Sequence, residues 1–308
     1  MLRAAEAQVR FADALDALAA AELPVLVGET ASGKTRLALE LARRIDGEVI
    51  GADSVQVYRG FDVGSGKPTT EELGGVRHHL LDVASPGEPF DAARFVELAD
   101  AAIEAARARG KRPIVCGGSY LWVRALLHGL ADAPRAQPEI RARLARELEA
   151  LGAPALHARL ASVDREAAAR LHPNDALRVT RALEVFEATG TTLSSLQAAH
   201  GFRERRHRAT VFAIRHPREV LEARIARRAE QMLAGGWIAE ARALIDAGHG
   251  ASKPMGAVGY AEVRAHLAGE LAEAQLLDAI VRATRVFARR QRTWLARAEV
   301  RWIEGPAD

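Results

Sequence analysis

Residues 28–35 read Gly28-Glu29-Thr30-Ala31-Ser32-Gly33-Lys34-Thr35, which matches the pattern G-x-x-x-x-G-K-T of a phosphate-binding loop. The apolar run 23–27 (LPVLV) before it predicts a buried strand, and the run 36–42 (RLALELA) after it has helical spacing. Because a strand, a glycine loop and a helix form the context that this motif needs, we favour a functional loop over a chance match.

The residue types in this loop suit an anionic ligand. Glycines allow the backbone N–H groups to turn inward, and the helix N-terminus adds a partial positive charge. Lys34 is predicted to pair with the terminal phosphates, and the Thr35 hydroxyl is predicted to hold Mg²⁺. We therefore expect a phosphorylated ligand to be bound by Gly28, Thr30, Ala31, Ser32, Gly33, Lys34 and Thr35.

Composition narrows the class of protein. The chain has 308 residues, of which 49% are hydrophobic, enough for a sizeable core and too many for a disordered chain. The single cysteine, Cys116, excludes an intrachain disulfide and fits a cytoplasmic setting. No apolar stretch reaches transmembrane length, and the first residues lack the apolar run of a signal peptide, so we expect no membrane partner.

Further strands and helices alternate along the chain. The runs 49–52 and 112–116 predict strands, and 91–110 predicts a helix between them. This alternation indicates an α/β fold with a parallel sheet and helices on both faces. Ligands bind at the carboxyl ends of such strands, where Asp53, Ser54 and Ser119 are expected to meet the phosphate loop.

A change of composition near 134–138 indicates a second unit. Residues 134–205 are rich in Ala, Leu, Arg and Glu and lack a strand pattern, which predicts a helical insertion into a core formed by 23–133 and 206–308. Residues 1–22 are predicted to be a helical extension, with an amphipathic helix over 4–21.

Asp53 is the strand-end carboxylate of this region. It is a candidate general base for a bound nucleophile, a role that typically contributes about 10²–10⁴-fold to a rate. The alternative is a helix N-cap or a water-mediated magnesium partner, and the local sequence does not separate these roles.

The C-terminal helical segment carries a basic face. Arginines recur at the spacing i, i+3, i+7 and i+10, at Arg282, Arg285, Arg289 and Arg292. Ala283, Phe287 and Trp294 are predicted to lie on the opposite face and pack on the core. A solvated charged face normally mixes signs, so a phosphate backbone is the favoured partner of this face.

Several motifs together resemble the tRNA dimethylallyltransferases, also called tRNA isopentenyltransferases, over nearly the whole chain from Leu23 to Trp302. The matching segments, in order, are residues 28–35, Asp53-Ser54-Val55-Gln56 with Tyr58, Lys67-Pro68, His78-His79-Leu80-Leu81-Asp82, Gly117-Gly118-Ser119, His172-Pro173-Asn174-Asp175, Arg178, Arg181-Ala182-Leu183-Glu184, Val258-Gly259-Tyr260, Thr284-Arg285, Arg290-Gln291 and Thr293-Trp294. The chain departs from the family pattern at Glu29, where proline is usual, and we expect this side chain to point away from the anion site.

The resemblance implies a P-loop catalytic core with an inserted all-helical domain, and it implies the chemistry. The enzyme would transfer a dimethylallyl group from dimethylallyl diphosphate to N6 of the adenosine 3′ of the anticodon (position 37) in certain tRNAs. Asp53 would take the N6 proton, Ser119 would position the reacting groups, and Lys34 with Mg²⁺ on Thr35 would stabilise the leaving diphosphate.

The resemblance also implies how tRNA would be held. The helical insertion would contact the anticodon stem-loop, and the protein is expected to act as a monomer in the cytoplasm. The implied tRNA contacts are Asp53, Ser54, Val55, Gln56, Ser119, Arg141, Arg178, Arg181, Gly259, Tyr260, Arg282, Arg285, Arg289, Arg290 and Gln291.

Three alternatives remain. A P-loop small-molecule kinase or ATPase would turn over ATP and use Asp53 to activate a hydroxyl. A prenyltransferase acting on free adenine nucleotides would not need the basic segments, of which 201–230 holds nine arginines against four glutamates. A non-catalytic RNA-binding module would not need a phosphate loop beside a strand-end aspartate.

Overall fold

The computed structural model describes residues 8–134 and 137–306. These residues form two compact units, one reaching up to Leu127 and resuming at His207, and the other spanning His128–Arg206. The sequence composition had placed the division at 134 and 205. Among the described residues, no helix has both the length and the apolar character that crossing a bilayer requires.

The first unit is built on a parallel sheet, which confirms the predicted α/β class. Within the described residues the sheet has seven strands in the order β1-β7-β6-β2-β5-β3-β4, and every neighbouring pair is parallel. The strands are β1 (Gln8–Val9), β2 (Leu23–Gly28), β3 (Gly47–Gly51), β4 (His78–His79), β5 (Arg112–Gly117), β6 (Ala209–Arg215) and β7 (Arg301–Glu304).

Helices cover both faces of the sheet. Successive strand residues point to opposite faces, so each face presents apolar side chains that a layer of helices buries. Leu26 of β2 belongs to an apolar cluster with α1 (Ala14–Ala19) and α2 (Lys34–Ile45). Its neighbours Val25 and Val27 belong to the cluster on the other face, with α4 (Ala92–Ala108) and α5 (Tyr120–His128). Each fully buried side chain of this kind stabilises the fold by about 1.5–3 kcal/mol.

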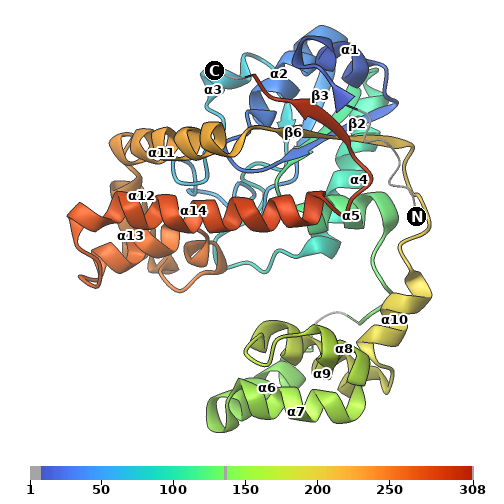
Figure 1. Cartoon of the computed structure of the whole chain (residues 1–308), viewed down its shortest axis with the longest axis vertical. Helices are drawn as coiled ribbons and strands as arrows, with labels where there is room; N and C mark the ends of the chain where they lie inside the picture. Colours follow the sequence, from blue (N-terminus) through green and yellow to red (C-terminus); the bar gives the residue numbers. More distant parts are fainter. Residues whose placement is uncertain (1–7, 135–136, 307–308) are drawn as a thin grey trace. The chain divides into compact units, whose positions relative to one another are not determined.

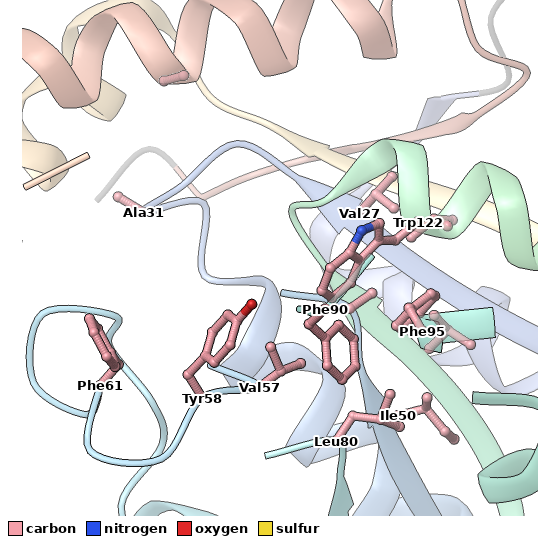
Figure 2. Close-up of a cluster of buried hydrophobic side chains, with 14 of the residues drawn as sticks. Val27, Ala31, Ile50, Val57, Tyr58, Phe61, Leu80, Phe90, Phe95 and Trp122 are labelled. Carbon is pink, nitrogen blue, oxygen red and sulfur yellow. The ribbon is translucent and has the colours of Figure 1, made fainter. Parts of the chain in front are cut away.

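Aromatic side chains pack together in the apolar cluster that contains Val25 and Val27. Trp122 of α5 stacks on Phe95 of α4, with ring centroids 4.8 Å apart and planes inclined by 21°. Phe90 packs against the same indole at 5.3 Å, as Figure 2 shows. These contacts fix α5 close to the end of β5.

The remaining elements of this unit lie between successive strands in the sequence. They are η1 (Phe11–Asp13), α3 (Thr70–Leu73), α11 (Arg218–Ala234), α12 (Trp237–Leu244), η2 (Ile245–His249), η3 (Lys253–Gly256), α13 (Tyr260–Leu267) and α14 (Glu273–Leu295). The long helices α11 and α14 run side by side (Figure 1). Both helices supply side chains to the site described below.

A buried ion pair lies near the start of β3. Glu48 is 5% exposed and accepts two hydrogen bonds from Arg109, from Nε at 3.1 Å and Nη2 at 2.6 Å. His79 Nε2 lies 2.6 Å from the same carboxylate. The hydrogen bonds from Arg109, aided by His79, lower the pKa of Glu48 to about 2.

The second unit is helical throughout its described regular elements. It contains α6 (Pro138–Leu151), α7 (Ala153–Val163), α8 (Arg165–Arg170), α9 (Ala176–Thr189) and α10 (Leu193–His200). Leu144, Leu156, Leu160 and Leu183 lie in its own apolar core, separate from the two clusters around the sheet.

The helix predicted over 4–21 is wrong at its described start and shorter in the structure, where the 3₁₀ turn η1 and α1 together cover residues 11–19. Residues 4–7 lie outside the described residues, Gln8–Val9 form β1, and only Ala14–Ala19 form an α-helix. Gln8 and Val9 pair with Trp302 and Ile303 of β7. A partner almost 300 residues away in the sequence therefore overrides the local helical pattern.

Candidate active site

The phosphate loop joins β2 to α2 as predicted. Ala31 and Gly33 adopt positive φ angles of 62° and 86°, which turn the backbone sharply before Lys34. The Lys34 ammonium donates to the Glu29 carbonyl at 3.4 Å. Burial lowers the pKa of Lys34, and nearby Arg228 adds to the effect.

The ends of β3 and β5 bring Asp53 and Ser119 to this loop. Ser119 N donates to the Ala52 carbonyl at 3.1 Å, and Ser119 Oγ accepts from Ser54 N at 3.0 Å. Gly117 permits this close approach, because a Cβ there would lie 2.0 Å from the Ala52 oxygen. Asp53 Oδ1 accepts hydrogen bonds from the amides two and three residues ahead, at 2.9 and 3.2 Å.

Asp53 and Ser119 line one cavity of about 310 Å³ together with Thr30 and Ala31 of the phosphate loop. This volume lies near the lower end of the roughly 300–1,000 Å³ usual for small-molecule sites. One part of the lining is polar and comes from the phosphate loop and strand ends: Thr30, Ala31, Asp53, Ser54, Gly118 and Ser119. Another part is mainly apolar and includes Ile225, Ala229, Met232, Trp237, Val258, Ile280 and Phe287.

Two arginines on α11 belong to the site, and we did not predict them. Arg224 Nε donates to the Ala31 carbonyl at 2.9 Å, and Arg228 lines the cavity. Burial lowers the pKa of Arg228, while the Asp53 carboxylate opposes this shift. The sequence shows only that Arg224 and Arg228 share one helix face; in the structure Arg224 reaches the phosphate loop, and Arg228 lies 3.5 Å from the Ser65 carbonyl of the loop after Asp53.

The loop after Asp53 is held by the side chains of Glu240 and Gln56. Glu240 of α12 accepts the amides of residues 62–64 and the hydroxyl of Tyr260. Gln56 Nε2 donates to the carbonyls of Ser65 and Gly66 at 3.1 and 3.0 Å. The side-chain nitrogen of Gln56, a residue expected to contact tRNA, is thus bonded to the protein's own loop in this structure.

Gly259 and Tyr260 lie inside the protein and beside the cavity. Gly259 has φ +88°, and a Cβ there would lie 2.1 Å from Cη2 of Trp237. Tyr260 is 1% exposed, and burial followed by the hydrogen bond to Glu240 raises the pKa of its phenol. In this structure both residues shape the cavity wall and present no side-chain polar group to solvent.

The predicted faces of the C-terminal helix need correction. Phe287 and Trp294 were expected to pack on the core, yet they are 37% and 49% exposed. Gln291, expected at the RNA, is 8% exposed; its Oε1 accepts from Thr30 N at 2.9 Å and its Nε2 donates to the Gly118 carbonyl at 3.0 Å. A buried glutamine is favourable here because Thr30 of the phosphate loop and Gly118 after β5 supply partners for the two ends of its amide.

The basic face of α14 borders a groove against α11. Arg282, Arg285, Arg289 and Arg292 line this groove together with Arg218 and Glu222. Arg285 lies 3.5 Å from Glu222, and Arg292 forms an ion pair with Glu29. Arg290 is exposed on the same helix. The face therefore mixes signs more than the helix sequence alone suggested, because acids from α11 and the phosphate loop reach it.

The three candidate arginines of the helical unit also have acidic partners. Arg141 and Arg181 flank the buried carboxylate of Glu184 at 3.3 and 2.9 Å. Arg178 pairs with Asp175 at 2.8 Å, and the Asp175 carboxylate also caps the start of their helix, α9. Arg141 and Arg178 keep more than half of their side-chain surface exposed, so they can still contact a polyanion.

The site unites a phosphate loop, a strand-end carboxylate, two further cations and an apolar wall, an arrangement suited to an enzyme acting on a phosphorylated apolar substrate. The chain belongs to the IPP transferase family, whose model matches residues 56–298. This confirms the resemblance drawn from the motifs.

Individual relatives agree with this assignment. The chain is 54% identical to the tRNA dimethylallyltransferase of Sorangium cellulosum over 285 residues, covering 92% of this chain and 91% of the relative. Among solved structures it resembles the tRNA isopentenylpyrophosphate transferase of Bacillus halodurans, with 38% identity, a TM-score of 0.68, and coverage of 92% and 89%. A eukaryotic dimethylallyltransferase acting on tRNA matches with 25% identity, a TM-score of 0.76, and coverage of 94% and 75%.

Proposed function

We propose that this protein transfers a dimethylallyl group from dimethylallyl diphosphate to N6 of the adenosine 3′ of the anticodon (position 37) in certain tRNAs. One observation carries the proposal: the phosphate loop, Asp53 and an apolar wall line a single cavity in a member of this family. The names of its relatives point to the dimethylallyl group and to tRNA.

The leaving diphosphate would lie against the phosphate loop. As N6 bonds to the allylic carbon, the C–O bond breaks and its electron pair passes to the diphosphate. Lys34, Arg224 and Arg228 surround the place where this charge develops. Their charges are fixed before the reaction begins, so they stabilise the transition state without reorganisation.

Asp53 would remove the proton that N6 loses. Two backbone amides hold Oδ1, which fixes the orientation of the carboxylate at the cavity. Ser119, hydrogen-bonded to the backbone beside Asp53, would position the adenine and the diphosphate relative to each other. A stacked adenine cannot enter a cavity of this size, so the base would be flipped out of the anticodon loop.

A magnesium ion fits the donor set of the site. The described residues contain no cluster of three or more His, Cys, Asp and Glu that would hold a metal without help. Mg²⁺ commonly takes few protein ligands and completes its shell with substrate phosphates and waters. Thr35, with its hydroxyl at the start of α2, would hold the ion, which would supply charge neutralisation at the leaving diphosphate.

The tRNA would be gripped by basic residues of both units, with one protein molecule acting as a monomer. Backbone phosphates would bind along α14 at Arg282, Arg285, Arg289 and Arg290, and the anticodon stem-loop would contact the helical unit through Arg141, Arg178 and Arg181. Phosphate contacts of this kind position a nucleic acid without reading its sequence. A free adenine nucleotide, as the alternative acceptor, is too small to contact these arginines on both units.

The deciding assay is transfer of label from radiolabelled dimethylallyl diphosphate to unmodified tRNA with Mg²⁺, beside free AMP and an ATPase assay. Label in tRNA without ATP turnover supports the proposal. Label in AMP alone would keep the chemistry and overturn the acceptor. ATP turnover alone would return the protein to the kinase or ATPase class.

The role of Asp53 is tested by Asp53→Ala, with Asp246→Asn as an exposed control. We expect kcat to fall by about 10²–10⁴-fold, much more than tRNA affinity, because a base acts mainly in the transition state. An equal loss in kcat and in tRNA affinity would contradict the role of base.

A further inference from the structure

The phosphate loop carries a buried negative charge. Glu29 is 4% exposed and follows the first glycine of the loop. Both of its carboxylate oxygens accept hydrogen bonds from Arg292 of α14, from Nε at 3.0 Å and from Nη2 at 3.3 Å. This bidentate arrangement is the strongest geometry available to an arginine and a carboxylate.

An unpaired carboxylate at this place would oppose the binding of an anion. Lys34 bonds to the carbonyl of the same residue, so the Glu29 side chain lies in the electrostatic environment of the anion site. Burial raises the pKa of Glu29, and Arg292 acts against that shift. Because the Glu29 carboxylate is buried, removing Arg292 would leave its charge uncompensated, which is more harmful than losing both partners.

The neighbouring residue strengthens the same connection. Gln291 accepts the amide of Thr30 and donates to the carbonyl of Gly118. Two consecutive residues of α14 therefore hold two consecutive residues of the phosphate loop. Gln291 and Arg292 lie on one turn of α14, so the helix contacts the phosphate loop at two neighbouring positions.

We propose that Arg292 is a positioning residue for the diphosphate: it neutralises Glu29 and, with Gln291, ties α14 to the phosphate loop. The inference rests on the proposed function only in naming the diphosphate as the bound anion. Glu29 thereby turns towards α14, and the loop retains a net positive site despite its acidic residue.

A four-way comparison of the wild type, Arg292→Gln, Glu29→Gln and the double variant tests this. We expect Arg292→Gln to raise KM for dimethylallyl diphosphate by about tenfold or more at a nearly unchanged kcat. Glu29→Gln should leave KM unchanged or lower it, because it removes a negative charge. The double variant should return to within about threefold of the wild type, since no uncompensated charge remains.

A tether without an electrostatic role gives a different pattern. In that case the double variant would be at least as impaired as Arg292→Gln, and the proposal would be overturned. Arg218→Gln is the matched control, because Arg218 lines the same groove from α11, pairs with Glu222 and is not the partner of Glu29. We expect it to leave KM for dimethylallyl diphosphate unchanged.

Calorimetric binding of inorganic diphosphate with Mg²⁺ to the same four proteins gives a readout independent of turnover. The order of Kd values should follow the order of KM values. If Arg292→Gln does not fold, Glu29→Gln still decides, because weaker diphosphate binding by that variant would contradict the inference. An inactive wild type would instead count against the proposed function, whereas an active wild type with an unaffected Arg292→Gln variant would overturn only this inference.

Discussion

Replacing Glu240 by glutamine tests how the wall of the cavity is held. One oxygen of this carboxylate accepts two amides of the loop, and the other accepts a third amide and a hydroxyl. The donors are Asp62 N at 2.9 Å, Val63 N at 2.6 Å, Gly64 N at 3.1 Å and Tyr260 Oη at 2.5 Å. The isosteric change leaves the packing intact and alters only charge and hydrogen bonding.

The magnitude follows from counting these bonds. A glutamine keeps one carbonyl oxygen but turns an NH₂ group towards two donors, so two bonds to a charged acceptor are lost at roughly 1.5–3 kcal/mol each. Because Asp62 is exposed and water can replace its bond, we expect the free energy of unfolding to fall by about 3 kcal/mol. For a chain of this length, Tm should then fall by roughly 6 °C.

Urea-induced unfolding followed by circular dichroism measures this loss. Glu219→Gln is the control, because Glu219 is exposed on α11 and the same substitution there should change stability by less than about 0.5 kcal/mol. kcat/KM for label transfer should fall in Glu240→Gln alone, since Gly64 and Ser65 line the cavity. A loss of stability no larger than that of the control would refute the idea that Glu240 holds the loop.

Three further outcomes are expected. Arg285→Ala should weaken tRNA binding and flatten the dependence of log Kd on log salt, measured by filter binding; an unchanged slope would remove Arg285 from the RNA surface. Glu48→Gln should destabilise the fold above pH 4.5, and the difference from the wild type should shrink as the pH falls towards 2, because the folded pKa of about 2 lies below the ordinary value of 4.5. Gly259→Ala should destabilise by about 3 kcal/mol or more, because φ is +88° and the new Cβ meets Trp237, whereas Gly256→Ala, with open space around its Cβ, should be nearly neutral in a thermal melt.

The part of the fold that local sequence determines could be predicted. The strand, loop and helix around Lys34 are contiguous, so their pattern is complete within twenty residues. The meeting of Asp53 with Ser119 also follows from a general property, because the carboxyl ends of parallel strands share one edge of the sheet. The structure places both at the phosphate loop.

Features that depend on distant partners could not be predicted in this way. Gln8 and Val9 form a strand only because β7 offers them a free edge, so an amphipathic pattern of helical period misled the prediction. Arg224 and Arg228 were visible as charges, but their position at the loop depends on how α11 packs against α14. The many arginines were all interpreted as contacts to a nucleic acid, so the two that lie at the diphosphate site were not distinguished from the rest.

The faces of α14 show why polarity is a weak guide near a functional loop. The helix was oriented on the assumption that its arginines face a phosphate backbone while alanine, phenylalanine and tryptophan face the core. Near the phosphate loop polar residues turn inward instead: Gln291 is buried and accepts from the Thr30 amide, and the partly exposed Arg292 donates to the buried Glu29 carboxylate. Burial of a polar side chain is favourable wherever its hydrogen bonds are satisfied. Fastening these two residues to the loop therefore sets the rotation of the helix, and the aromatic side chains are consequently left near the opening and the surface.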